Sequence, residues 1–247
     1  MGWLRMMNEK RETTVDDLDE NEQDALAATG RALAGLVPMF GGVVGELITK
    51  VVPAQRTDRV VRYVRDLNAR LDAFETDLTD LLSEPENVDL IEEGGFQAAR
   101  ATSPERIDMI ATLVANGLGS EDADLVRRKR LARLLGQLDD DEIVLLNAYG
   151  QSYGGGRAAW DAINRPDPAH LGSDRSQIDA EKLFDAGREH LLRLGLLHKN
   201  YRKPPRGQAP VFDARKGDYE HSVEVSYLGR LLLRHLDMPT PIDSDRD

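Results

Sequence analysis

Residues Thr57–Ser83 read TDRVVRYVRDLNARLDAFETDLTDLLS and carry the clearest helical pattern in the chain. Apolar residues recur there at alternating steps of four and three, at Val60, Val64, Leu67, Leu71, Phe74, Leu78 and Leu81. This spacing places them on one stripe of an α-helix, as in the seam of a coiled coil. We therefore predict a helix over Thr57–Ser83 with a buried seam, packed either against another helix of the same chain or against a second copy.

The rest of the chain favours a mainly α protein. Its 247 residues are 40% hydrophobic and 31% charged, which is typical of a soluble globular protein large enough to bury a core. Helical patterns continue to about Tyr149, and the character of the sequence changes after Gly150. We expect an N-terminal helical bundle followed by a winged-helix-like α+β module.

A glycine-rich stretch without charged residues lies between Arg31 and Glu46 and is 14 residues long. A single membrane-spanning helix needs about 20 residues. The stretch is interpreted as two short buried helices joined by a tight turn, and the alternative is a hairpin that leaves the core and enters a bilayer. The residues of this hinge or membrane hairpin are Pro38, Phe40, Gly41, Gly42 and Gly45. No signal-peptide pattern opens the sequence, so we expect a cytoplasmic protein without a stable membrane span.

Four segments follow from these patterns. They are a solvated acidic tail at 1–22, a helical domain at 23–137 with the glycine-rich hairpin and the heptad helix, a winged-helix-like module at 138–237, and a tail at 238–247.

The sequence offers no constellation for catalysis. It has no cysteine, and none of its five histidines stands at a metal-ligand spacing. No phosphate-binding loop or nucleophile-elbow motif occurs either. We therefore expect no catalytic residue, no metal, no cofactor and no small-molecule substrate. The acidic run Asp139–Glu142 is interpreted as a capping box that opens a helix at Asp140, because a helix N-terminus favours carboxylates.

Charge is distributed unevenly along a chain whose net charge is −12. Residues 71–93 contain nine acids and no base, whereas residues 127–133 contain five bases and no acid. One interpretation is that both are solvated faces. The other is that each faces a surface of opposite charge.

The C-terminal region has a charge balance of its own. Residues 186–235 carry ten bases and five acids. A helix, a basic loop, the alternating strand Ser222–Ser226 and a closing helix at Tyr227–Leu236 follow one another there, an order that resembles the recognition helix, wing and last helix of MarR-type regulators. The candidate residues for binding nucleic acid or a protein partner are Arg188, Arg193, Lys199, Arg202, Lys203 and Arg206.

A wider resemblance covers residues 85–236. The short motifs ERI at 105–107, ANGL at 115–118, LLGQL at 134–138, LRLGL at 192–196 and VSYLGR at 225–230 are similar, in this order, to those of the Abi-alpha (abortive infection alpha) proteins of bacteria. That resemblance implies a role in phage defence and carries over no catalytic residue.

The function expected from the sequence is that of a non-enzymatic regulatory or protein-interaction protein, plausibly in phage defence. The alternatives are a winged-helix DNA-binding regulator and a membrane-perturbing effector. We expect a protein partner or self-association, and only weak binding of nucleic acid, because the acidic remainder of the chain repels a polyanion.

Overall fold

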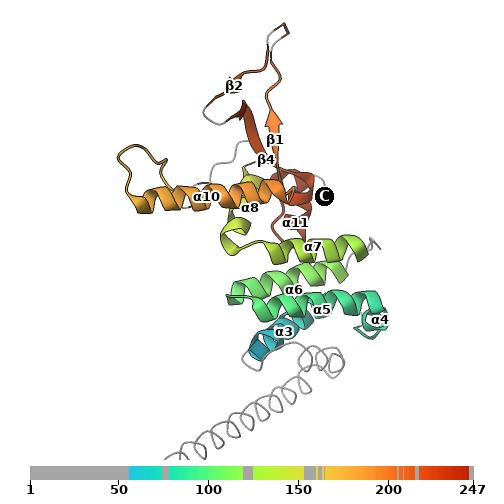
Figure 1. The fold of residues 1–247 in the computed structure, drawn as a ribbon. Coiled ribbons are helices and arrows are strands. Elements are labelled where there is room, and N and C mark those ends of the chain that lie inside the picture. Colours follow the sequence, from blue (N-terminus) through green and yellow to red (C-terminus); the bar gives the residue numbers. More distant parts are fainter. Residues whose placement is uncertain are drawn as a thin grey trace, which may run out of the picture. The chain divides into compact units, whose positions relative to one another are not determined.

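The protein is described from a computed structural model, which covers residues 56–73, 78–118, 125–152, 160, 163, 165–204, 206–207, 209–214 and 217–244. The predicted acidic tail and the glycine-rich hairpin with Pro38, Phe40, Gly41, Gly42 and Gly45 lie outside these residues. The chain divides into two compact units, Met1–Arg133 and Leu134–Asp247. Helices predominate in the described residues, so the mainly α fold class is confirmed (Figure 1).

The described part of unit 1 is built of helices only. They are α3 (Thr57–Ala73), α4 (Leu78–Ser83), α5 (Pro85–Arg100), α6 (Pro104–Leu118) and α7 (Leu125–Gln137), the last of which extends across the unit boundary. Helices α3, α5 and α6 pack against one another.

The heptad seam is buried along α3, whereas its last residue, Leu81 on the separate helix α4, is half-buried. Val60, Val64, Leu67 and Leu71 are all 2% exposed or less, and Phe74 and the side chain of Leu78 lie outside the described part. Because α3 packs on α5 and α6, the seam is covered from within the same chain. The fully buried Tyr63 widens the buried face beyond the a/d line.

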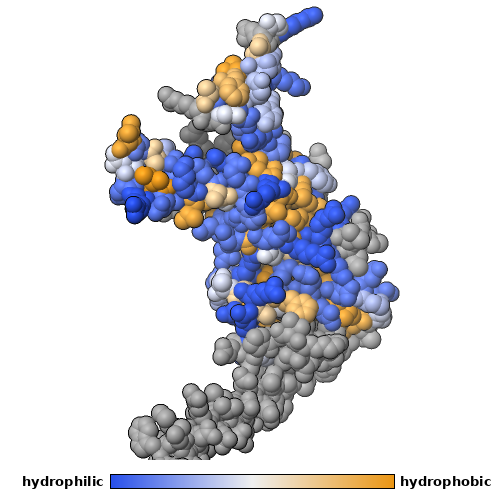
Figure 2. All heavy atoms as spheres, viewed as in Figure 1, coloured by the Kyte–Doolittle hydropathy of each residue, from blue (hydrophilic) through white to orange (hydrophobic). Residues whose placement is uncertain are grey.

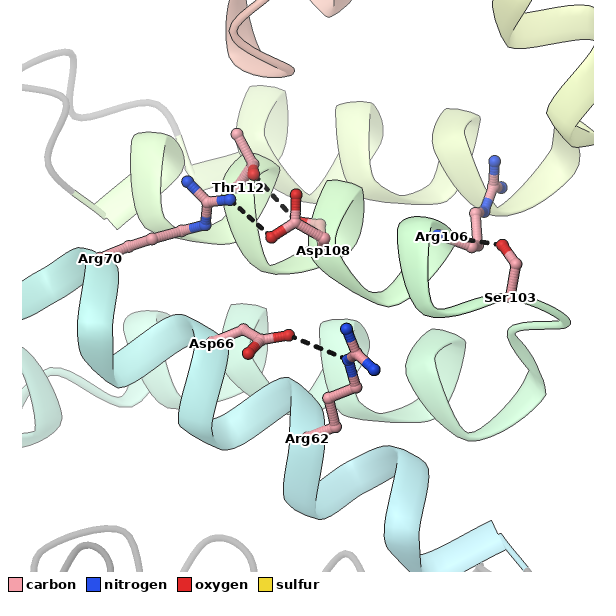
Figure 3. A network of polar contacts seen from close by, with 7 residues as sticks. All are labelled: Arg62, Asp66, Arg70, Ser103, Arg106, Asp108 and Thr112. Atoms are coloured by element: carbon pink, nitrogen blue, oxygen red, sulfur yellow. Dashed lines mark hydrogen bonds and ion pairs between the residues drawn. The ribbon is translucent and has the colours of Figure 1, made fainter.

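Polar contacts tie the outer face of α3 to itself and to α6 (Figure 3). Arg62 pairs with Asp66 at 3.5 Å, and Arg70 reaches across to Asp108 at 2.7 Å. The Thr112 hydroxyl donates to the backbone carbonyl of Asp108 at 2.8 Å. At the start of α6, the backbone N–H of Arg106 donates to Ser103 Oγ at 3.1 Å, which caps the helix.

The two oppositely charged segments of the sequence meet between α5 and α7. Lys129 forms an ion pair with Asp89, and Arg133 Nε lies 3.8 Å from Glu93 Oε2. Gln97 Nε2 also donates to the backbone carbonyl of Ala132 at 2.7 Å. Part of the acidic segment 71–93 therefore faces the basic run 127–133, in accordance with the second of the two interpretations.

Unit 2 combines helices with a long antiparallel hairpin. Its elements are α8 (Asp140–Gln151), α10 (Arg175–Arg193), β1 (Leu197–Tyr201), β2 (Phe212–Asp213), β3 (Asp218–Tyr219), β4 (His221–Val225), α11 (Tyr227–His235) and α12 (Pro241–Ser244). Strand β1 pairs with β4, with Leu197 opposite Val225 and Tyr201 opposite His221, and β2 pairs with β3. The fully buried core residues of the unit include Leu146, Leu191, Leu196, Leu232 and Leu233.

Local signals explain where these helices begin. The capping box at the start of α8 is present as predicted: Asp139 Oδ1 accepts from the backbone N–H of Glu142 at 2.7 Å, and Glu142 Oε2 accepts from that of Asp139 at 3.0 Å. An equivalent box between Asp174 and Gln177 opens α10, which begins at Arg175. Ser226 caps α11 and also donates to the carbonyl of Gly195 at 2.6 Å.

The segment after α11 differs from the tail predicted at 238–247. Thr240 is fully buried, and Gln151 Nε2 donates to the carbonyl of Pro239 at 2.9 Å. Asp243 of α12 lies 3.5 Å from Arg234. These contacts with α8 and α11 hold the segment from Pro239 to Asp243 on the unit.

Candidate functional site

The hairpin of unit 2 is held in shape by two ribbons that meet at Glu220. The backbone carbonyl of Glu220 accepts from the N–H of Arg202 at 3.2 Å, and its N–H donates to the carbonyl of Val211 at 3.0 Å. Glu220 therefore joins β3, which pairs with β2, to β4, which pairs with β1 (Figure 1).

An ion pair joins β1 to β3 close to Glu220. Lys199 Nζ on β1 lies 2.9 Å from Asp218 Oδ2 on β3. The hydrogen bond from Lys199 is the main cause that lowers the pKa of the Asp218 carboxyl, and it raises the pKa of the Lys199 ammonium. Hydrogen bonds from Asn200 and Ser222 lower the pKa of Glu224 in the same way.

Large apolar side chains are exposed on the hairpin. The exposed fractions are 50% for Tyr201, 60% for Val211, 55% for Phe212 and 48% for Tyr219. The rings of Phe212 and Tyr219 meet edge to face with their centroids 5.4 Å apart. Figure 2 shows apolar atoms gathered on the hairpin beside β2. Exposed apolar groups of this size in one place are typical of a binding surface.

Basic side chains border this apolar group. Arg202 and Lys203, both exposed, line a groove of about 620 Å³ together with Tyr201, Tyr219 and His221. Arg206 is exposed in the connection between β1 and β2. We call the surface formed by Tyr201, Arg202, Lys203, Arg206, Val211, Phe212 and Tyr219 the hairpin surface.

Arg188 and Arg193 lie on α10, whereas the other predicted site residues lie on the hairpin. Arg188 pairs with Asp185 at 3.0 Å and lines a cavity of about 340 Å³ with Tyr149, Trp160 and Arg165. Burial raises the pKa of the Tyr149 hydroxyl there, against the lowering effect of the Arg188 and Arg165 charges. Arg193 is exposed in the last turn of α10. Lys199 is bound to Asp218, so Arg202, Lys203 and Arg206 are the predicted bases that the hairpin presents to solvent.

A second surface was missed by sequence reasoning. A groove of about 1080 Å³ runs along α8 and α10, and Figure 2 shows apolar atoms along α10. We call it the α8–α10 groove. Its lining includes Val144, which is 50% exposed, and Leu183, which is 74% exposed. The sequence signal was available, since both are apolar residues at positions outside the buried stripe of their helix.

A buried carboxylate lies at the base of this groove. Glu142, which is buried, places Oε1 2.7 Å from Nδ1 of His190. Since the other oxygen of Glu142 already caps α8, the pair joins the start of α8 to the last turns of α10. The chemistry visible here is structural: it fixes the two walls of the groove.

The described residues contain neither a membrane-spanning helix nor a cluster of metal ligands. No helix among them is long and apolar enough to cross a membrane. Within the same residues, no group of three or more histidine, aspartate or glutamate side chains is placed to hold a metal ion.

No protein-family model matches the chain, and comparisons with curated proteins and with solved structures give no match. The side chains of unit 2 are therefore the basis on which its surfaces are interpreted.

Proposed function

We propose that the chain is a non-enzymatic interaction protein and that the hairpin surface of unit 2 binds an acidic segment of a protein partner. One observation carries the proposal: four large apolar side chains are exposed beside the exposed bases Arg202, Lys203 and Arg206. Protein interfaces combine an apolar, often aromatic centre with a polar rim, and bases at the rim select an acidic partner.

The proposal extends to the fold of unit 2. The order α8, α10, β1–β4 hairpin, α11 is similar to that of a winged helix, in which α10 takes the place of the recognition helix and the hairpin that of the wing. Many modules of this shape bind protein, so the similarity alone does not select a partner.

The charge of α10 favours protein over DNA as the partner. The helix carries four bases and four acids, and one of the bases, Arg188, is paired with Asp185. A helix that lies in the major groove of DNA needs a positive face, because phosphate contacts supply most of the affinity. The whole chain carries −12, which adds repulsion.

The resemblance to Abi-alpha proteins supports the proposal that this interaction serves phage defence in the bacterial cytoplasm. In that setting the hairpin surface recognises the protein partner through which infection is sensed or growth is arrested.

The test combines a phage challenge with a DNA-binding measurement. Wild-type chain and the Arg202→Glu/Lys203→Glu variant are expressed in a sensitive bacterium with the genomic neighbours of the chain. The matched control is Arg100→Glu/Arg130→Glu, which makes the same charge change at exposed positions of unit 1. We expect protection or growth arrest with the wild type and the control, and its loss with the hairpin variant.

Duplex binding by the purified proteins is then measured at physiological salt, where the Debye length is about 8 Å. We expect weak, sequence-independent binding that the hairpin variant changes little. Tight, sequence-selective binding that the hairpin variant abolishes would instead identify a DNA-binding regulator.

A further inference from the structure

We propose that the partner of the hairpin surface is a second copy of this chain, and that the hairpin of one copy docks head to tail into the α8–α10 groove of the next. This inference rests on the proposed function and names the partner of the same site.

The groove is lined by acidic side chains, opposite in charge to the bases of the hairpin surface. Among the described residues, its lining contains the carboxylates of Asp139, Asp141, Glu142 and Asp167 and no lysine or arginine. Asp141 and Asp167 are exposed, whereas Asp139 and Glu142 are engaged in the capping box. Two carboxylates are therefore open at a groove whose walls also present Val144 and Leu183 to solvent.

The hairpin surface is complementary to the groove both in charge and in its exposed apolar side chains. Its apolar side chains include Val211 and Phe212, which fit the apolar walls, and its exposed bases Arg202 and Lys203 match the open carboxylates. Burial of such side chains against an apolar wall is favourable, and the opposite charges fix the orientation.

The groove and the hairpin of one chain do not meet. The groove lies along α10 up to His190 and along the first turns of α8. The hairpin begins at Leu197, after the C-terminal end of α10, and projects away from the helices (Figure 1). None of its described residues lines the groove. The hairpin surface is therefore free to enter the groove of another copy.

Contacts between like surfaces are disfavoured. Two hairpin surfaces would bring basic side chains together, and two grooves would bring carboxylates together, each at an electrostatic cost. Docking of hairpin into groove is a heterologous contact, which produces a ring when the rotation closes and an open chain when it does not.

The experiment measures self-association of the full chain by sedimentation velocity from about 1 to about 200 µM, where weak complexes become populated. The groove variant is Asp141→Arg/Asp167→Arg. Its matched control is Glu105→Arg/Asp179→Arg, which makes the same charge change at exposed acids outside the groove. Glu105 is the second residue of α6, as Asp141 is of α8, so the effect on the helix dipole is matched as well.

We expect the groove variant and Arg202→Glu/Lys203→Glu each to weaken self-association at least tenfold, as the loss of paired interface charges does. The Glu105→Arg/Asp179→Arg control should associate as the wild type does. A third variant, Ala180→Trp, fills the groove without a change of charge and should also weaken association. Thermal unfolding of each variant shows whether it is folded.

Mixing makes the test specific. The hairpin variant keeps an intact groove and the groove variant keeps an intact hairpin, so their mixture should associate although neither variant does so alone. A chain with both double reversals carries swapped charges on both surfaces and should regain self-association.

The inference is overturned if the wild type is monomeric at every concentration, or if folded hairpin and groove variants associate as the wild type does. If the wild type is monomeric and the hairpin variant still abolishes phage protection, the self-association fails and the proposed function stands. If self-association depends on both surfaces but the chain binds duplex DNA tightly through the same bases, the proposed function fails instead.

Discussion

Tyr63 of α3 and Gly94 of α5 touch so closely that no other residue fits at position 94 without a shift. A β-carbon on Gly94 would stand 2.8 Å from Cζ of Tyr63 and 2.8 Å from Cγ2 of Val114 on α6. Tyr63 is fully buried, and its hydroxyl donates to the carbonyl of Ile91 at 3.0 Å. Burial raises the pKa of this hydroxyl, so it remains a proton donor. The missing side chain at Gly94 thus sets how closely the three helices approach.

Gly94→Ala should destabilise unit 1 although alanine is the better helix former. Overpacking costs about 1 to 3 kcal/mol, against a gain of about 1 kcal/mol in helix propensity. The measurement is the free energy of unfolding in urea. Gly136→Ala is the control, because Gly136 is exposed on α7 and gains the propensity alone. Equal effects of the two substitutions would show that α3 and α5 are not in contact at Gly94.

Leu71→Asp tests the buried seam of α3. Leu71 is almost fully buried, so a carboxylate there would be desolvated without a partner at a cost of about 3 to 5 kcal/mol. We expect insoluble or molten protein. Ala69→Asp puts the same charge on the exposed face of α3 and should leave the protein folded. A soluble Leu71→Asp protein with an unchanged thermal midpoint would show that the seam is exposed.

The Lys199–Asp218 pair predicts that the stability of the hairpin depends on pH. The pKa of Asp218 is lowered in the folded protein below its ordinary value of 3.8. The pair therefore contributes fully to folding stability above pH 3.8, and this contribution is lost as the pH falls through the lowered pKa of the folded state. The pKa of Lys199 is raised, so the contribution is also lost as the pH rises through that raised value.

Lys199→Met should therefore move the pKa of Asp218 upward, as followed by the NMR shift of its carboxyl carbon. The return is partial, because the N–H of Tyr219 still donates to Asp218 at 2.8 Å. Lys203→Met is the control and should leave this pKa unchanged. An unaltered pKa in Lys199→Met would mean that the ion pair does not form in solution.

Gly229→Ala should destabilise unit 2 selectively. A β-carbon on Gly229 would stand 3.2 Å from the carbonyl carbon of Leu196 and 2.9 Å from Cγ2 of Val225, and backbone cannot move aside as a flexible side chain can. We expect a loss of about 1 to 3 kcal/mol. Hydrogen exchange should accelerate in β1, β4 and α11 and stay unchanged in α5 and α6. Faster exchange in both units would show that they do not unfold independently.

Several elements could be predicted because their signals are local. The buried face of α3 follows from the spacing of Val60, Val64, Leu67 and Leu71, and the start of α8 follows from Asp139 and Glu142 three residues apart. The alternation before Ser226 located β4 to within one residue. Each of these patterns involves residues within a turn or two of the chain, where the backbone geometry sets which side chains meet.

The candidate site was predicted in part for the same reason. The bases Arg202, Lys203 and Arg206 were visible as a charged segment. That Lys199 is bound to Asp218, and that Val211 and Phe212 stand exposed beside those bases, depends on the register of two ribbons, and a shift of one residue would reverse every side chain.

The sequence by itself determined that the chain is mainly helical, where several helices begin and where β4 lies, and that opposite charges are gathered at 71–93 and 127–133. Only the tertiary structure decided that Lys129 meets Asp89, that α5 and α6 cover the seam of α3, and that Val144 and Leu183 line one groove. The physical reason is distance along the chain. A helical period states which face of a helix is apolar, whereas the surface that covers it is chosen by the packing of segments tens of residues apart, and hydrophobic burial has no direction that a local pattern could encode.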